Sequence, residues 1–99
     1  MDRAPDSLPV FSALAHATRW AAYEALLRAG ADGMPQSGVA TALGVDRHLL
    51  SAHLKVMREA GLVTAERRGR EVTYRALAEA AADAAAAIGR LLEGSSATR

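Results

Sequence analysis

The chain has 99 residues, of which 51% are hydrophobic, a formal net charge of +1 and no cysteine. This length corresponds to one small domain, for which an interface with a second copy would add stability. The lack of cysteine excludes disulfides and thiolate metal sites, and the N-terminal residues show no secretory signal pattern, so we expect a soluble cytoplasmic protein.

The N-terminal third is expected to hold two helices. Residues 1–7 are expected to be a flexible leader, and apolar residues at Val10, Phe11 and Leu14 predict a short helix after it. Thr18 is a suitable cap for a second helix, and the segment 31–35 that follows this helix is expected to be a loop. The predicted buried stripe of the second helix is Trp20, Tyr23, Leu26 and Leu27.

The middle of the chain has the pattern of a helix-turn-helix. A short helix is expected over residues 36–43, ending at Gly44, because a left-handed residue after a helix is usually glycine. Asp46 is then a good N-cap for a second helix that ends at Gly61. The inner stripe of this second helix is formed by Leu50, Leu54 and Met57.

A β-hairpin and a long helix complete the predicted fold. Alternating, β-branched segments over residues 62–68 and 72–75 flank a turn that contains Gly69. A last helix is expected over residues 78–93, followed by a flexible tail, 94–99. Residues 8–93 are therefore predicted to be one mainly α domain, a winged helix-turn-helix in the order α-α-α-α-β-β-α.

The last helix has no remaining core to enter fully, so its apolar stripe is expected to form a dimer surface. The stripe consists of Ala81, Ala84, Ala85, Ile88, Leu91 and Leu92.

Basic residues gather in the helix-turn-helix and hairpin. Residues 44–75 hold seven basic and four acidic side chains, whereas the rest of the chain holds five basic and seven acidic ones. Such a basic segment is typical of nucleic-acid binding. On the second helix of the helix-turn-helix, Arg47 can form two hydrogen bonds with guanine, and Lys55 is suited to a phosphate. Ser51 can form a hydrogen bond with a base or a phosphate, and His48 is expected to face the DNA.

The hairpin places Arg67, Arg68 and Arg70 around one glycine. Three arginines at such a tip favour a wing along the DNA, with Arg68 and Arg70 contacting the phosphate backbone or the minor groove. The alternative is that the hairpin does not contact DNA and that its charged side chains only keep this exposed segment soluble.

The sequence resembles the ArsR/SmtB family of bacterial winged-helix repressors. The matching stretches are residues 14–19, 39–45, 50–63 and the wing, 68–75. The run Ser51 to Val63, which reads SAHLKVMREAGLV, is specific in this context. The resemblance implies a homodimer held by the first and last helices, which adds Phe11 and Leu14 to the predicted interface. It also implies binding to an inverted-repeat DNA operator and repression relieved by an inducer.

The sequence departs from the family at both familiar metal sites. Where arsenic sensors of the family carry a Cys-x-Cys, this chain has Pro35, Gln36 and Ser37. Zinc and nickel sensors of the family place Asp and His ligands on the last helix, whereas the last helix of this chain has Glu79, Asp83 and Glu93 and no histidine. We therefore expect no metal and no cofactor.

Functions other than DNA binding have weaker support in the sequence. Catalysis has little support, because Ser51 and His53 point apart on a helix, and we expect no enzyme. A winged helix can also be a protein-interaction module for an acidic partner. Small side chains beside Trp20 and Tyr23 suggest either compensated core packing or a pocket for a small apolar effector. A third alternative is a regulator that binds DNA and responds to no inducer.

Overall fold

The computed structural model describes residues 6–97, with side chains through Ser95, and has one elongated body of about 54 × 23 × 23 Å. Residues 1–5 of the predicted leader and residues 98 and 99 of the predicted tail lie outside the described part. The elements are α1 (Leu8–Leu14), α2 (Ala17–Ala29), a 3₁₀ turn (Gly30–Asp32), β1 (Met34–Pro35), α3 (Gln36–Leu43), α4 (Arg47–Glu59), β2 (Val63–Arg68), β3 (Glu71–Ala76) and α5 (Ala78–Ala97). The predicted winged-helix order is confirmed, with one short strand added.

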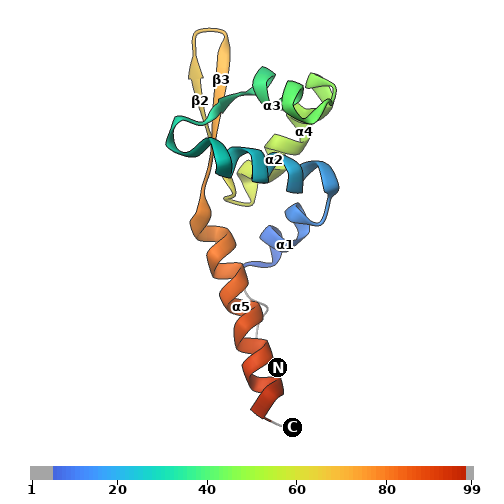
Figure 1. Ribbon diagram of the computed structural model, residues 1–99, viewed down its shortest axis with the longest axis vertical. Helices are drawn as coiled ribbons and strands as arrows, with labels where there is room; N and C mark the ends of the chain where they lie inside the picture. The colour runs from blue at the N-terminus through green and yellow to red at the C-terminus, as the bar shows by residue number, and fades with distance from the viewer. Residues whose placement is uncertain (1–5, 98–99) are drawn as a thin grey trace.

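The helices and the sheet divide the molecule into three regions (Figure 1). Helices α1 to α4 form a compact body, the β2–β3 hairpin projects from one end, and α5 extends from the other. The core lies where these elements meet, and its largest fully buried side chains are Leu26, Val39, Leu50, Leu54, Met57 and Leu62. The Tyr23 hydroxyl donates a 2.7 Å hydrogen bond to the Leu77 carbonyl, which fixes the start of α5 against α2.

The added strand, β1, lies in a segment that we expected to be a loop. Met34 pairs with Tyr74 and Pro35 with Thr73, so the sheet has the order β1-β3-β2. Gly33 makes this pairing feasible: its φ is +68°, and a Cβ at this position would collide with the Tyr74 carbonyl oxygen. Only glycine combines this backbone angle with so close an approach of two backbones.

Two details of the helix ends differ from expectation. The N-cap of α2 is His16 and not Thr18, because the His16 Nδ1 accepts a 3.2 Å hydrogen bond from the Thr18 amide. Helix α5 continues to Ala97, past the predicted end at Glu93, so Gly94 lies inside the helix.

No helix in the described range, 6–97, is long and apolar enough to cross a lipid bilayer.

Two histidines and an arginine join α2 to α4. The Arg19 Nε donates a 2.6 Å hydrogen bond to the Ala13 carbonyl, and Arg19 Nη1 lies 3.1 Å from the His53 Nδ1. The rings of His16 and His53 are 4.5 Å apart and tilted. Burial, and then the positive charge of His16 and Arg19, lower the pKa of His53 below its usual 6.5. This contact therefore favours a neutral His53.

We expect this cluster to make stability depend on pH. Since the pKa of His53 is lower in the folded chain, the unfolded chain binds the proton more readily. The contribution of His53 is complete above pH 6.5 and is lost as the pH falls toward the folded pKa. Urea unfolding at fixed protein concentration should show a free energy of unfolding that falls from pH 7.5 to pH 5, with a shallower fall for His53→Gln.

The control is His48→Gln, which changes an exposed histidine of α4 outside this cluster. It should keep the pH slope of the parent protein. Identical slopes for the parent and His53→Gln would contradict the assignment.

Candidate nucleic-acid interface

The turn between α3 and α4 sets the position of the candidate DNA-binding helix. Gly44 has φ +66° and its amide closes α3 by donating to the Thr41 carbonyl, as predicted for the residue after the helix. Asp46 caps α4: its carboxylate accepts hydrogen bonds from the amides of His48 (2.7 Å) and Leu49 (3.2 Å). The Gln36 side chain donates to the Arg47 carbonyl at 3.3 Å, so the starts of the two helices are joined.

Helix α4 has one fully buried face and one exposed face. Leu50, Leu54 and Met57 have no exposed surface and enter the core. Every other α4 residue except the half-buried His53 is exposed, including all four side chains predicted to contact DNA: Arg47, His48, Ser51 and Lys55. The buried stripe orients the helix, and the polar stripe is left available to a ligand.

Three of the predicted residues line one surface hollow. His48, Ser51 and Lys55 surround a depression of about 510 Å³ together with Ala52, Arg58 and Tyr74 of β3. Arg47 does not line it, but lies one helical turn before Ser51 on the exposed face.

Arg58 was absent from the predicted site. The signal for it was present in the sequence, because Ser51, Lys55 and Arg58 follow the i, i+4, i+7 spacing of one helix face. Leu49 is 66% exposed and therefore does not pack within this chain.

The wing is a tight hairpin with basic side chains at its end. Arg68 pairs with Glu71 across a two-residue turn, and Gly69 is the turn residue with positive φ, +60°. This is the pattern of a type II′ turn, which suits the twist of a hairpin. Arg67, Arg68 and Arg70 are all exposed.

The three wing arginines are not equivalent. Glu66 accepts a 2.9 Å hydrogen bond from Arg75 and a 3.4 Å one from Arg68, so Arg68 is partly neutralised. The hydrogen bond from Arg75, and then the charge of Arg68, lower the pKa of the Glu66 carboxyl. Within residues 6–97, Arg67 and Arg70 form no ion pair. They are the more available cations.

Two further contacts hold the wing to the body. Arg75 Nε donates a 2.7 Å hydrogen bond to the Ala31 carbonyl, and the Ser37 hydroxyl donates a 3.3 Å hydrogen bond to the Glu71 carboxylate. The start of α3 is therefore tied to the start of α4 and to the outer end of the wing, whereas the base of the wing is tied to the 3₁₀ turn.

No three His, Asp or Glu side chains converge on a possible metal position in the described part of the chain.

Comparison with known proteins gives the family. No protein-family model matches the chain. The structure of an ArsR-like transcriptional regulator from Rhodococcus sp. RHA1 aligns with a TM-score of 0.80 and 31% identity, over 94% of this chain and 85% of that one. Mb0332 from Mycobacterium bovis, a homodimeric winged helix-turn-helix DNA-binding domain, aligns with a TM-score of 0.69 and 26% identity, over 95% of this chain and 84% of that one.

A curated relative matches more closely over a shorter stretch. The repressor SmtB of Mycobacterium tuberculosis is 59% identical over 34 residues, which are 34% of this chain and 25% of that protein. The match thus spans about a quarter of the length of this relative. The full-length structural alignment, together with the helix-turn-helix and wing described above, leads to one conclusion: the chain belongs to the ArsR family of transcriptional regulators.

Proposed function

We propose that the protein is a homodimeric transcriptional repressor that binds an inverted-repeat DNA operator through α4 and the wing. The observation that carries the proposal is the division of α4 into a fully buried apolar face and an exposed polar one. A helix held in this way can enter a major groove without losing its own packing.

The side chains of the proposed interface differ in what they can read. Arg47, at the start of α4, can donate two parallel hydrogen bonds to guanine. Lys55 and the wing residue Arg70 are suited to phosphates, and Arg68 contributes less because Glu66 competes for it. His48, Ser51 and Arg58 complete the surface beside Lys55.

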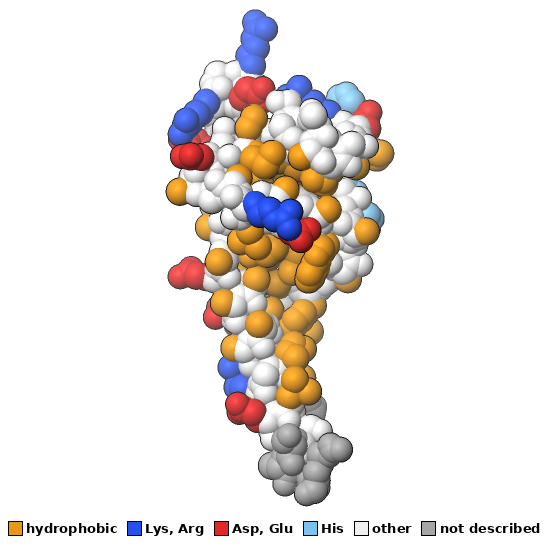
Figure 2. Space-filling model, in the orientation of Figure 1, with side chains coloured by type: hydrophobic (Ala, Val, Ile, Leu, Met, Phe, Trp, Pro, Cys, Tyr) orange, Lys and Arg blue, Asp and Glu red, His pale blue; other side chains and the backbone are white. Residues whose placement is uncertain are grey.

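The proposed dimer surface is the exposed part of the apolar stripe on α5. Ile88, Leu91 and Leu92 are 43%, 71% and 64% exposed, and hydrophobic side chains continue along this helix (Figure 2). Contiguous exposed apolar surface of this kind marks an interaction site. Mb0332 is a homodimer, which supports a homodimer here.

The rest of the predicted interface lies closer to the core. Ala84 is only 4% exposed and packs within its own chain, so it has little surface left for a partner. Phe11, Leu14, Ala81 and Ala85 border the exposed stripe and line a pocket beside it.

A two-fold dimer predicts an operator with half-sites about one DNA turn apart. The response of the repressor would not use the familiar metal sites of the family, because the chain has no cysteine and α5 has no histidine.

The proposed division of labour can be tested with two arginine variants. Arg47→Ala should relax the choice of sequence, weakening binding to the preferred operator by ~1–3 kcal/mol. Arg70→Ala should weaken binding to all duplexes alike and reduce the salt slope by about one unit. Selection from a random duplex pool would supply the operator, and gel shifts at several salt concentrations would give the affinities.

The matched control is Arg90→Ala, which removes an exposed arginine of α5, far from the wing. It should bind DNA like the parent protein. Loss of affinity that is uniform across sequences for both Arg47→Ala and Arg70→Ala would refute the proposed roles.

The dimer surface can be tested by placing a charge in the apolar stripe. Ile88→Glu would bury an unpaired carboxylate in the proposed interface, so sedimentation should show a monomer with much weaker operator binding. Ala86→Glu, on the exposed opposite side of α5, should remain dimeric. If Ile88→Glu sediments as the parent protein does, this surface is not the interface.

A further inference from the structure

Leu49 is a large apolar side chain on the exposed side of α4. It is 66% exposed, and among the large apolar side chains of residues 6–97 only Leu91 exposes a larger fraction. A leucine stabilises a fold through the apolar surface that it removes from water, so Leu49 contributes little to this one. Its side chain is available to a partner.

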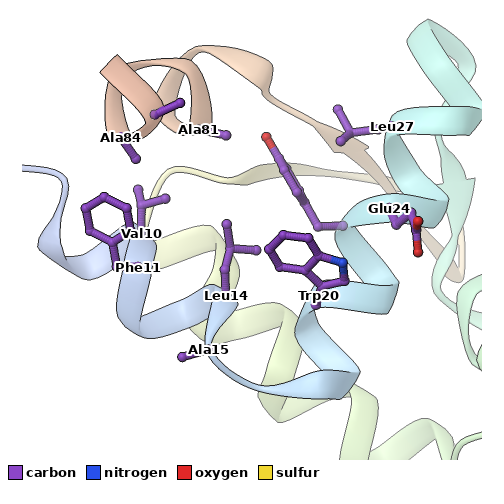
Figure 3. A pocket seen from close by; sticks show the side chains of 11 residues that line it. Val10, Phe11, Leu14, Ala15, Trp20, Glu24, Leu27, Ala81 and Ala84 are labelled. Atoms are coloured by element: carbon purple, nitrogen blue, oxygen red, sulfur yellow. The ribbon is translucent and has the colours of Figure 1, made fainter. Parts of the chain in front are cut away.

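Most other exposed large apolar side chains lie near the proposed dimer surface. Trp20 and Leu27 line the pocket between α1, α2 and α5 (Figure 3), and Leu91 and Leu92 lie on α5 itself. Helix α4 lies toward the other end of the molecule (Figure 1). A second copy seated on the exposed half of α5 therefore lies away from Leu49.

The first turn of α4 holds the backbone of Leu49 in place. The Leu49 amide donates a 3.2 Å hydrogen bond to the Asp46 carboxylate, and the amide of Leu50 donates a 3.0 Å hydrogen bond to the Asp46 carbonyl. Leu50 is completely buried. The capped turn and the buried neighbour set the direction in which Leu49 projects, so a ligand that binds there has little backbone to order.

The surroundings of Leu49 are basic. From Arg47 to Arg58, α4 has three Lys or Arg residues and no Asp or Glu. Ala52, which follows Leu49 at i+3, is exposed and lines the hollow that also contains Lys55 and Arg58. Because Ala52 is small, a ligand can approach the helix closely at this point. An apolar protein partner would remove water from the basic side chains at a cost, whereas DNA supplies phosphates for them.

We propose that Leu49 recognises a thymine in each half-site of the operator through apolar contact with the C5-methyl group of the base. In the major groove of unmodified DNA only thymine presents this methyl group, whereas cytosine presents an amino group. A cytosine at the same position would leave its amino donor without an acceptor against the leucine. Leu49 thus adds a second base preference to the guanine contact proposed for Arg47.

This inference rests on the proposed function, because it requires that α4 enters the major groove. It goes further in assigning one base of each half-site to one side chain.

The test starts from an operator selected from a random duplex pool with the parent protein. Each thymidine is replaced in turn by deoxyuridine, which removes only the C5-methyl group and keeps the base pair. Gel shifts should show one position in each half-site at which this replacement weakens binding of the parent protein roughly fourfold, as expected for the loss of one buried methyl group. At that position Leu49→Ala should bind both duplexes equally, because it has already lost the contact.

Val56→Ala is the matched control, because it shortens a 37% exposed apolar side chain of α4 two turns after Leu49. It should keep the sensitivity of the parent protein to deoxyuridine. Circular dichroism checks that each variant is folded.

The inference is overturned if the parent protein binds the operator and no deoxyuridine replacement weakens this binding. It is also overturned if the replacement weakens Leu49→Ala as much as the parent protein. In both cases the proposed binding of DNA stands. A parent protein that binds no duplex at low ionic strength would instead overturn the proposed function, and this inference with it.

Discussion

The structure depends on the burial of one face of α4. Leu50, Leu54 and Met57 are completely removed from water, and they fill the centre of a core to which almost every element contributes. Replacing any of these side chains by alanine would cost about 2–5 kcal/mol, a large part of the stability of a domain this small. The same burial determines which side chains of α4 face outward. Stability and the candidate DNA-binding surface therefore have a common origin.

Polar contacts then fix details that burial leaves open. The Asp46 carboxylate sets the first turn of α4, where the proposed base contacts begin. Arg19 connects the end of α1 to His53 on α4, so the helices of the body and the candidate DNA-binding helix are coupled. Arg75 holds the wing to the 3₁₀ turn. Figure 1 shows the result: the candidate DNA-binding elements lie at one end of the molecule and the exposed half of α5 at the other.

Most of the fold could be predicted because its signals are local. Gly44 and Asp46 mark the ends of two helices, and the apolar spacing of α4 identifies its buried face. Strand β1 could not be predicted, because two residues have no periodicity and their pairing depends on a close approach of Gly33 to a strand forty residues away. The pairing of Arg68 with Glu66 was missed although its signal is local, because residues two apart on a strand share a face. Small side chains beside Trp20 and Tyr23 suggested a pocket as one of two alternatives, and the structure has an apolar pocket lined by residues of α1, α2 and α5.

The most direct test of the central claim is to follow the amide NMR signals of the protein while a short mixed-sequence duplex is added at low ionic strength. If α4 presents its polar face to DNA, the largest changes should fall on the first turns of α4 and on the tip of the wing, with little change in the exposed half of α5. The absence of any change, or changes confined to helices other than α4, would contradict the account.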